Sequence, residues 1–90
     1  MKQGDTFRSK DKNSNTRYIV IDKVYDGTLS AMKITKNGSI VNKGKGMARH
    51  PVKRVFKKTT IYKKYVPIKI KVSKNVKIYL RTPTRERRLL

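Results

Sequence analysis

Apolar and polar residues alternate most regularly near the end of the chain, in residues 67–81. Isoleucine, valine or leucine occupies every second position in 68–72 and again in 76–80, with lysine or tyrosine between them. A period of two is typical of β-strands. We expect a β-hairpin with a three-residue turn at 73–75, because this register pairs the aliphatic faces with each other and leaves a basic face outside. Its lysines either bind a polyanion or keep an exposed hairpin from aggregating.

Residues 17–35 form the next clear element, in which 18–25 are rich in β-branched and aromatic residues and the two-residue turn signal Asp26-Gly27 leads into a returning strand at 28–34. This turn places Ile21 opposite Met32. The apolar positions change parity just after Ile21, which predicts a bend or a β-bulge at 22–23. The stretch therefore predicts a bent hairpin, the device by which short sheets curl into barrels.

The remaining strands are shorter. Residues 4–7 predict a turn that runs into a first strand, and 50–56 predict a closing strand with a proline near its start. Asn37-Gly38 is another turn signal, which predicts a strand at 39–42 and hence a meander of three consecutive strands. Helix signals are weak, so 10–16 and 57–64 are expected to be polar connections.

The chain has 90 residues, which predicts one domain with a thin core. It contains no cysteine, which excludes disulfides, thiolate metal sites and cysteine nucleophiles. No apolar run reaches the roughly 20 residues of a membrane span, and the first residues lack the apolar core of a signal peptide. We expect a soluble cytoplasmic protein, located in the host cytoplasm or nucleoid if it is encoded by a phage.

The net charge of the chain is the feature that says most about its binding partners. The formal net charge is +20, and residues 43–90 hold 17 of the 25 lysines and arginines but only one acid. Such a balance is typical of nucleic-acid binding. Lysine outnumbers arginine, which favours contact with phosphates over recognition of bases. Binding to an anionic membrane would need a basic amphipathic helix, and the sequence pattern shows none, so no membrane partner is expected.

The candidate contacts to nucleic acid are the cations of the predicted hairpin, of the glycine-bearing loop at 43–46, of the closing strand and of the tail. The loop lacks the spacing of a Walker A motif. Tyr62, Tyr65 and Tyr79 lie among these cations and either stack on unpaired bases or pack against the barrel. The full set is Lys69, Lys71, Lys77, Tyr79, Arg81, Lys43, Lys45, Arg49, Lys53, Arg54, Lys63, Lys64, Arg85, Arg87 and Arg88.

No catalytic or metal site is predicted. His50 is the only histidine, so it has no second histidine or cysteine with which to bind a metal. The acids are scattered and supply no acid and base pair with it. We expect no enzymatic activity and no cofactor. These acids are Asp5, Asp11, Asp22, Asp26 and Glu86.

The order of the strands resembles a small SH3-like β-barrel of the KOW type, found in ribosomal and transcription-elongation proteins. The motif Gly4-Asp5-x-Phe7, the bent hairpin and the closing strand carry this resemblance over residues 4–56. It implies that nucleic acid binds to loops and exposed strand faces, here nearest to 10–15 and 43–49.

We therefore expect an all-β protein with a small SH3-like barrel of about five strands at 1–58. A basic β-hairpin extension at 59–82 and a basic tail at 83–90, either flexible or forming one turn of helix, complete the expected domain organisation. The function predicted first is non-enzymatic binding of DNA or RNA through the phosphate backbone with little sequence specificity, in a phage-encoded, ribosome-associated or transcription-associated protein. The alternative is a structural or regulatory protein-interaction module, for example a virion component or an inhibitor that docks on an acidic protein surface.

Overall fold

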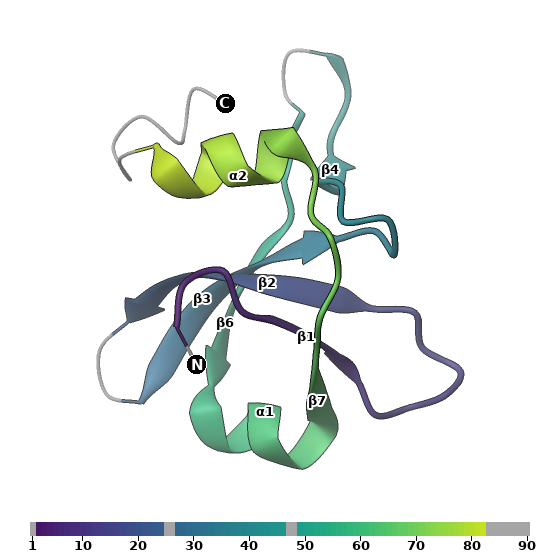
Figure 1. Cartoon of the computed structure of the whole chain (residues 1–90), viewed down its shortest axis with the longest axis vertical. Helices are drawn as coiled ribbons and strands as arrows, with labels where there is room; N and C mark the ends of the chain where they lie inside the picture. Colours follow the sequence, from purple (N-terminus) through teal and green to yellow (C-terminus); the bar gives the residue numbers. More distant parts are fainter. Residues whose placement is uncertain (1, 25–26, 47–48, 83–90) are drawn as a thin grey trace.

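The computed structural model describes residues 2–24, 27–46 and 49–82 (Figure 1). Two helices, α1 (Lys58–Lys64) and α2 (Lys74–Arg81), and two short strands that pair with each other, β4 (Asn42–Lys43) and β5 (His50–Pro51), accompany the main sheet. Its strands are β1 (Thr6–Ser9), β2 (Arg17–Val24), β3 (Thr28–Ile34), β6 (Lys53–Lys57) and β7 (Tyr65–Ile68). They form one antiparallel, curled sheet of five strands in the order β6-β3-β2-β1-β7. The predicted small all-β fold of five strands is confirmed.

The central strands of the sheet, β2 and β3, are buried on both faces. Along β2, Tyr18 and Val20 belong to one buried cluster while Ile19 and Ile21 belong to another. A continuous apolar run is typical of a strand that is covered on both sides. The first face carries the aromatic core, which consists of Phe7, Tyr18, Val20, Leu29, Ala31, Phe56 and Ile61. The second face carries the α2 core, which consists of Ile19, Ile21, Met32, Ile34, Val76 and Tyr79.

Aromatic side chains connect the two edge strands of the curled sheet. Phe7 of β1 stacks on Tyr18 of β2, with ring centroids 5.7 Å apart. Phe56 and Tyr65 come from the edge strands β6 and β7, and their rings meet edge to face at 5.4 Å. Each such pair contributes about 0.5–1.5 kcal/mol beyond the burial of its area. The curl of the sheet is therefore stabilised by side-chain contacts between strands at its opposite edges.

β2 and β3 pair in a register that differs from the predicted one. Ile19 lies opposite Met32, where the sequence pattern places Ile21. The register shifts between Val20 and Asp22, so that Ile21 is the extra residue of a β-bulge. The predicted bulge is confirmed, one residue earlier than expected. The pattern misplaces the register because apolar side chains are buried on both faces and alternation then no longer marks a single inner face.

The predicted turn at Gly38 is confirmed, but a full strand does not follow it. The Gly38 N–H donates to the carbonyl of Thr35 at 2.9 Å, and the chain then meets β3 only through a bridge between Ile34 and Ile40. β6 lies beside β3 instead, so the predicted meander of three consecutive strands is wrong. The predicted closing strand is confirmed as β5 followed by β6. The predicted turn residue Asp26 lies outside the described residues.

The β-hairpin predicted for 67–81 is wrong. β7 pairs with β1, and α2 begins directly after Ser73. The Ser73 Oγ accepts a hydrogen bond from the Val76 N–H at 3.4 Å and so caps the helix. Val76 and Tyr79 are buried, whereas the Ile78 side chain is 46% exposed. A strand would turn Val76 and Ile78 to the same face, so this burial pattern belongs to a helix.

The connection at 57–64, expected to be polar and without a helix, contains α1. α1 joins β6 to β7, and its Ile61 packs into the aromatic core. The two helices have 7 and 8 residues, about two turns each. Because β7 belongs to the main sheet, the barrel predicted for 1–58 takes its fifth strand from beyond that range.

Candidate nucleic-acid interface

α2 exposes cations on the side that faces away from the sheet. Lys74, Lys77 and Arg81 are exposed and follow one another at spacings of three and four residues, so they share one side of the helix. Val76 and Tyr79 are buried in the α2 core on the other side. α2 is therefore a basic amphipathic helix, which corrects the prediction that the chain has none. Its apolar side packs against the sheet.

A groove of about 480 Å³ runs beside the first turns of α2. Three lysines line it, and none of its described lining residues is acidic. Two of them, Lys71 and Lys77, were predicted contacts, and the structure brings them together. We call this feature the basic groove, and its lining residues are Asn37, Lys71, Val72, Ser73, Lys74 and Lys77.

The basic groove is built where the Gly38 turn packs against the segment that leads into α2. The Ser73 N–H donates to the carbonyl of Gly38 at 2.9 Å. Gly38 has a φ of +80°, and a Cβ atom there would lie 2.8 Å from the Cα of Val72 and would also meet the carbonyl oxygen of Lys71. Only glycine allows this close approach. The backbone beside Lys71 is thus held against the turn.

The electrostatics of the basic groove favour an anion. The first turn of α2 contains no acidic residue. The N-terminus of a helix carries partial positive charge, so Lys74 adds charge of the same sign to it. Lys71 and Lys77 line the same groove. A phosphate placed there would reduce the repulsion among all of these groups.

Sequence reasoning missed Lys74 because it placed this residue in a hairpin turn. The signal that identifies it is the helix signal itself. Ser73 is a good N-cap residue, and Val76, Tyr79 and Leu80 then follow at the spacings of one helical face. The same residues also satisfy a period of two, so the stretch matches both patterns.

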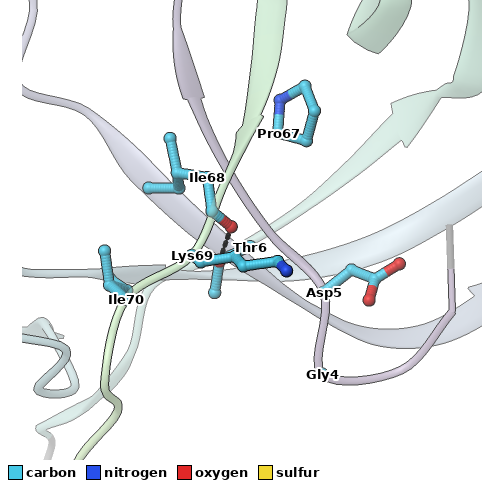
Figure 2. A pocket seen from close by; sticks show the side chains of 7 residues that line it. All are labelled: Gly4, Asp5, Thr6, Pro67, Ile68, Lys69 and Ile70. Carbon is cyan, nitrogen blue, oxygen red and sulfur yellow. Dashed lines mark hydrogen bonds between the residues drawn. The ribbon is translucent and has the colours of Figure 1, made fainter.

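Lys69 does not belong to the basic groove. It lines a separate groove of about 510 Å³ together with Asp5 (Figure 2). That groove lies where β1 meets β7, beside the hydrogen bond that the Thr6 Oγ1 donates to the carbonyl of Ile68 at 2.6 Å. A carboxylate among the lining residues makes this groove less suitable for a polyanion than the basic groove.

The three tyrosines considered for stacking differ in exposure. Tyr79 is 1% exposed and belongs to the α2 core, so its predicted role as a contact is wrong. The Lys53 Nζ lies 5.8 Å from the centre of its ring. Tyr65 is half-buried against the aromatic core. Tyr62 on α1 is 68% exposed and is the one of the three that presents its ring to solvent.

The other predicted cations that the structure describes are exposed and come from several different elements. The Cζ atom of Arg54, on β6, lies 4.9 Å from the ring centre of Phe56. α1, with two of the predicted lysines, lies at the opposite end of the molecule from α2 (Figure 1). Arg85, Arg87 and Arg88 lie outside the described residues. The described members of this group are Lys43, Lys45 and Arg49 near the β4–β5 connection, Lys53 and Arg54 on β6, and Lys63 and Lys64 on α1.

Two absences hold for the described part of the chain. Neither α1 nor α2 is long and apolar enough to cross a membrane. No group of three or more histidine, cysteine, aspartate or glutamate side chains among the residues described lies close enough to hold a metal ion. His50 is exposed, and its Nδ1 lies 3.3 Å from the carbonyl oxygen of Pro51.

Comparison with known proteins gives no family. No protein-family model matches the chain, and neither a curated protein nor a solved structure matches it. The functional assignment therefore depends on the residues and the geometry of the basic groove.

Proposed function

We propose that this protein is a non-enzymatic nucleic-acid-binding protein that contacts the phosphate backbone with little sequence specificity. The observation that carries the proposal is the basic groove, where Lys71, Lys74 and Lys77 line one surface at the start of α2 and no acid is found among the lining residues that the structure describes. Arg81 extends this positive surface along the helix. Successive phosphates of a nucleic acid provide the matching row of negative charges.

The kind of cation supports backbone contact over base recognition. The charged residues that line the basic groove are all lysines. A lysine ammonium acts as a point charge, whereas the planar guanidinium of arginine supplies the two parallel hydrogen bonds that recognise guanine. The net charge of +20 adds attraction at long range that does not depend on sequence.

A relation to KOW-type domains of ribosomal and transcription-elongation proteins stays a prediction. The five-strand curled sheet is compatible with it. The basic groove, however, involves 71–77, which lie beyond the residues that carry the resemblance. We propose that the segment after β7 contributes the principal binding surface of this chain.

The test compares two triple variants of equal net charge. Lys71→Gln, Lys74→Gln and Lys77→Gln together remove the lysines of the basic groove. Lys57→Gln, Lys63→Gln and Lys64→Gln together remove three exposed lysines on and beside α1. Binding to a fluorescent oligonucleotide is measured by anisotropy over a range of salt concentrations.

The groove variant should lose about 30- to 150-fold in affinity at low salt, and its slope of log K against log salt should be shallower by about two to three. The α1 variant should lose much less affinity because its lysines lie at the other end of the molecule. Equal losses in the two variants would mean that only net charge matters. Unchanged affinity in the groove variant would overturn the proposal.

A further inference from the structure

A second groove, of about 380 Å³, lies on the other side of the first turns of α2. Among the residues that the structure describes, none that lines this groove is charged. Its volume falls within the range of about 300–1,000 Å³ that is common for small-molecule sites. We call it the neutral groove, and the lining residues used below are Ile40, Asn42, Pro51, Ser73, Asn75 and Ile78.

The neutral groove and the basic groove meet at Ser73, which lines both. Along α2, Lys74 and Lys77 line the basic groove while Asn75 and Ile78 line the neutral groove. A flexible chain that passes over the start of α2 can therefore occupy both grooves at once. Its charged groups would lie on one side of the helix and its uncharged groups on the other.

The lining of the neutral groove combines amides with apolar side chains. Asn42 and Asn75 are exposed, and within the described residues neither amide group has a hydrogen-bond partner. An amide offers both donors and an acceptor, so it can bind the edge of any nucleobase. Ile78, 46% exposed, supplies apolar surface for the face of a base, and the half-buried Ile40 and the buried Pro51 form part of the groove wall. Two adjacent grooves thus offer lysines for the phosphates of a nucleic acid and amide and apolar side chains for one of its bases.

We propose that the neutral groove receives one unpaired nucleobase, and that the preferred ligand is a single strand whose phosphates lie in the basic groove. This inference rests on the proposed function. A base in a duplex has its edge paired and its faces stacked, so it cannot enter the groove without being flipped out. Because a side-chain amide can hydrogen-bond to the edge of every base, the inference is consistent with weak sequence preference.

The test uses three probes of equal length: a single-stranded oligonucleotide, the same strand with abasic sites in its centre, and the duplex. Abasic sites keep the phosphates and remove the bases. A base that packs on aliphatic side chains should contribute no more than the lower end of the range for stacking on an aromatic ring, so the wild-type protein should prefer the intact strand over the abasic strand by about 5- to 10-fold. The duplex should bind more weakly than the intact strand at the same salt concentration.

Two variants separate this inference from the proposed function. Asn42→Ala with Asn75→Ala changes two exposed side chains and should reduce binding of the intact strand toward the abasic level without changing the salt slope. Ile78→Ala should act in the same direction. The triple lysine variant of the basic groove should weaken binding of all three probes and flatten their salt dependence.

Equal binding of intact and abasic strands by the wild-type protein would overturn the inference and leave the proposed function standing. The inference would also be overturned if the wild-type protein bound the duplex more tightly than the intact strand. Full affinity for the intact strand in the double asparagine variant would overturn it as well. If the triple lysine variant binds every probe as tightly as the wild type does, the proposed function is contradicted as well. Circular dichroism of each variant establishes that it is folded.

Discussion

Ser73 and Gly38 are joined by a backbone hydrogen bond of 2.9 Å, in which the Ser73 N–H donates to the Gly38 carbonyl. This bond ties the start of α2 to the turn that follows β3. Near the other end of the helix, the Gln3 Nε2 donates to the carbonyl of Leu80 at 3.0 Å. α2 is therefore held to the rest of the fold by a hydrogen bond near each of its ends.

Gly38→Ala should destabilise the protein more than Gly4→Ala. Both glycines have positive φ, +80° and +92°, which costs alanine about 1–2 kcal/mol at either position. A Cβ at Gly4 has no atom within 4 Å, whereas one at Gly38 meets the backbone of Lys71 and Val72. We expect a loss of about 2–4 kcal/mol in the free energy of unfolding for Gly38→Ala. Urea denaturation measures both, and equal losses would contradict the packing of the turn against 71–72.

Val76→Ala and Ile78→Ala distinguish the helix from a hairpin. Val76 is fully buried and Ile78 is 46% exposed. We expect Val76→Ala to lower the free energy of unfolding by about 1–3 kcal/mol and Ile78→Ala to lower it by less than about 1 kcal/mol. In a hairpin both side chains would share the buried face, and the two losses would be similar. Thermal or urea unfolding of the two variants provides the comparison.

Ser73 should show opposite effects on stability and binding. Ser73→Ala removes the cap of α2 and should cost about 0.5–2 kcal/mol of stability. Ser73→Asp keeps a capping oxygen and places a negative charge at the helix N-terminus beside Lys71 and Lys74, so stability should be retained or increased. The same charge should repel phosphates and lower the affinity for nucleic acid. If Ser73→Asp binds as tightly as the wild type, phosphates do not occupy the basic groove.

Lys71→Gln should weaken binding more than Lys69→Gln. The two lysines are equivalent on the predicted hairpin, but in the structure Lys71 lines the basic groove and Lys69 lines the groove that contains Asp5. We expect a loss of about 3- to 10-fold and a salt slope shallower by about one for Lys71→Gln, and less than about a 2-fold loss for Lys69→Gln. Anisotropy titrations at two salt concentrations suffice. Equal effects of the two substitutions would mean that binding depends on the overall positive charge of the protein and not on the basic groove.

The candidate site was predicted only in part. The excess of lysine near the end of the chain is visible in the sequence, and two of the lysines predicted from it, Lys71 and Lys77, line the basic groove. Lys74 was missed and Tyr79 was misplaced, because both assignments depend on whether 74–81 form a strand or a helix. The neutral groove brings Asn42 and Asn75 onto one surface, and no local pattern joins two such distant residues.

The sequence by itself determines the features that arise from local physics. β-Branched and aromatic residues specify β2 and β3, and Asn37 and Gly38 specify a turn. The count of lysines and arginines specifies the charge. The parity change after Ile21 specifies a bulge to within one residue. None of these features requires knowledge of what packs on the sheet.

Only the tertiary structure decided the conformation of 74–81. Val76, Ile78 and Leu80 satisfy a period of two, while Val76, Tyr79 and Leu80 satisfy the helical spacing. The choice depends on the second face of the sheet, where Ile19, Ile21, Met32 and Ile34 need a cover. A helix capped by Ser73 buries Val76 and Tyr79 against that face and satisfies its own backbone hydrogen bonds, whereas a strand would need a further partner along its edge. Long-range burial therefore selected the helix, and with it the position of every lysine in the basic groove.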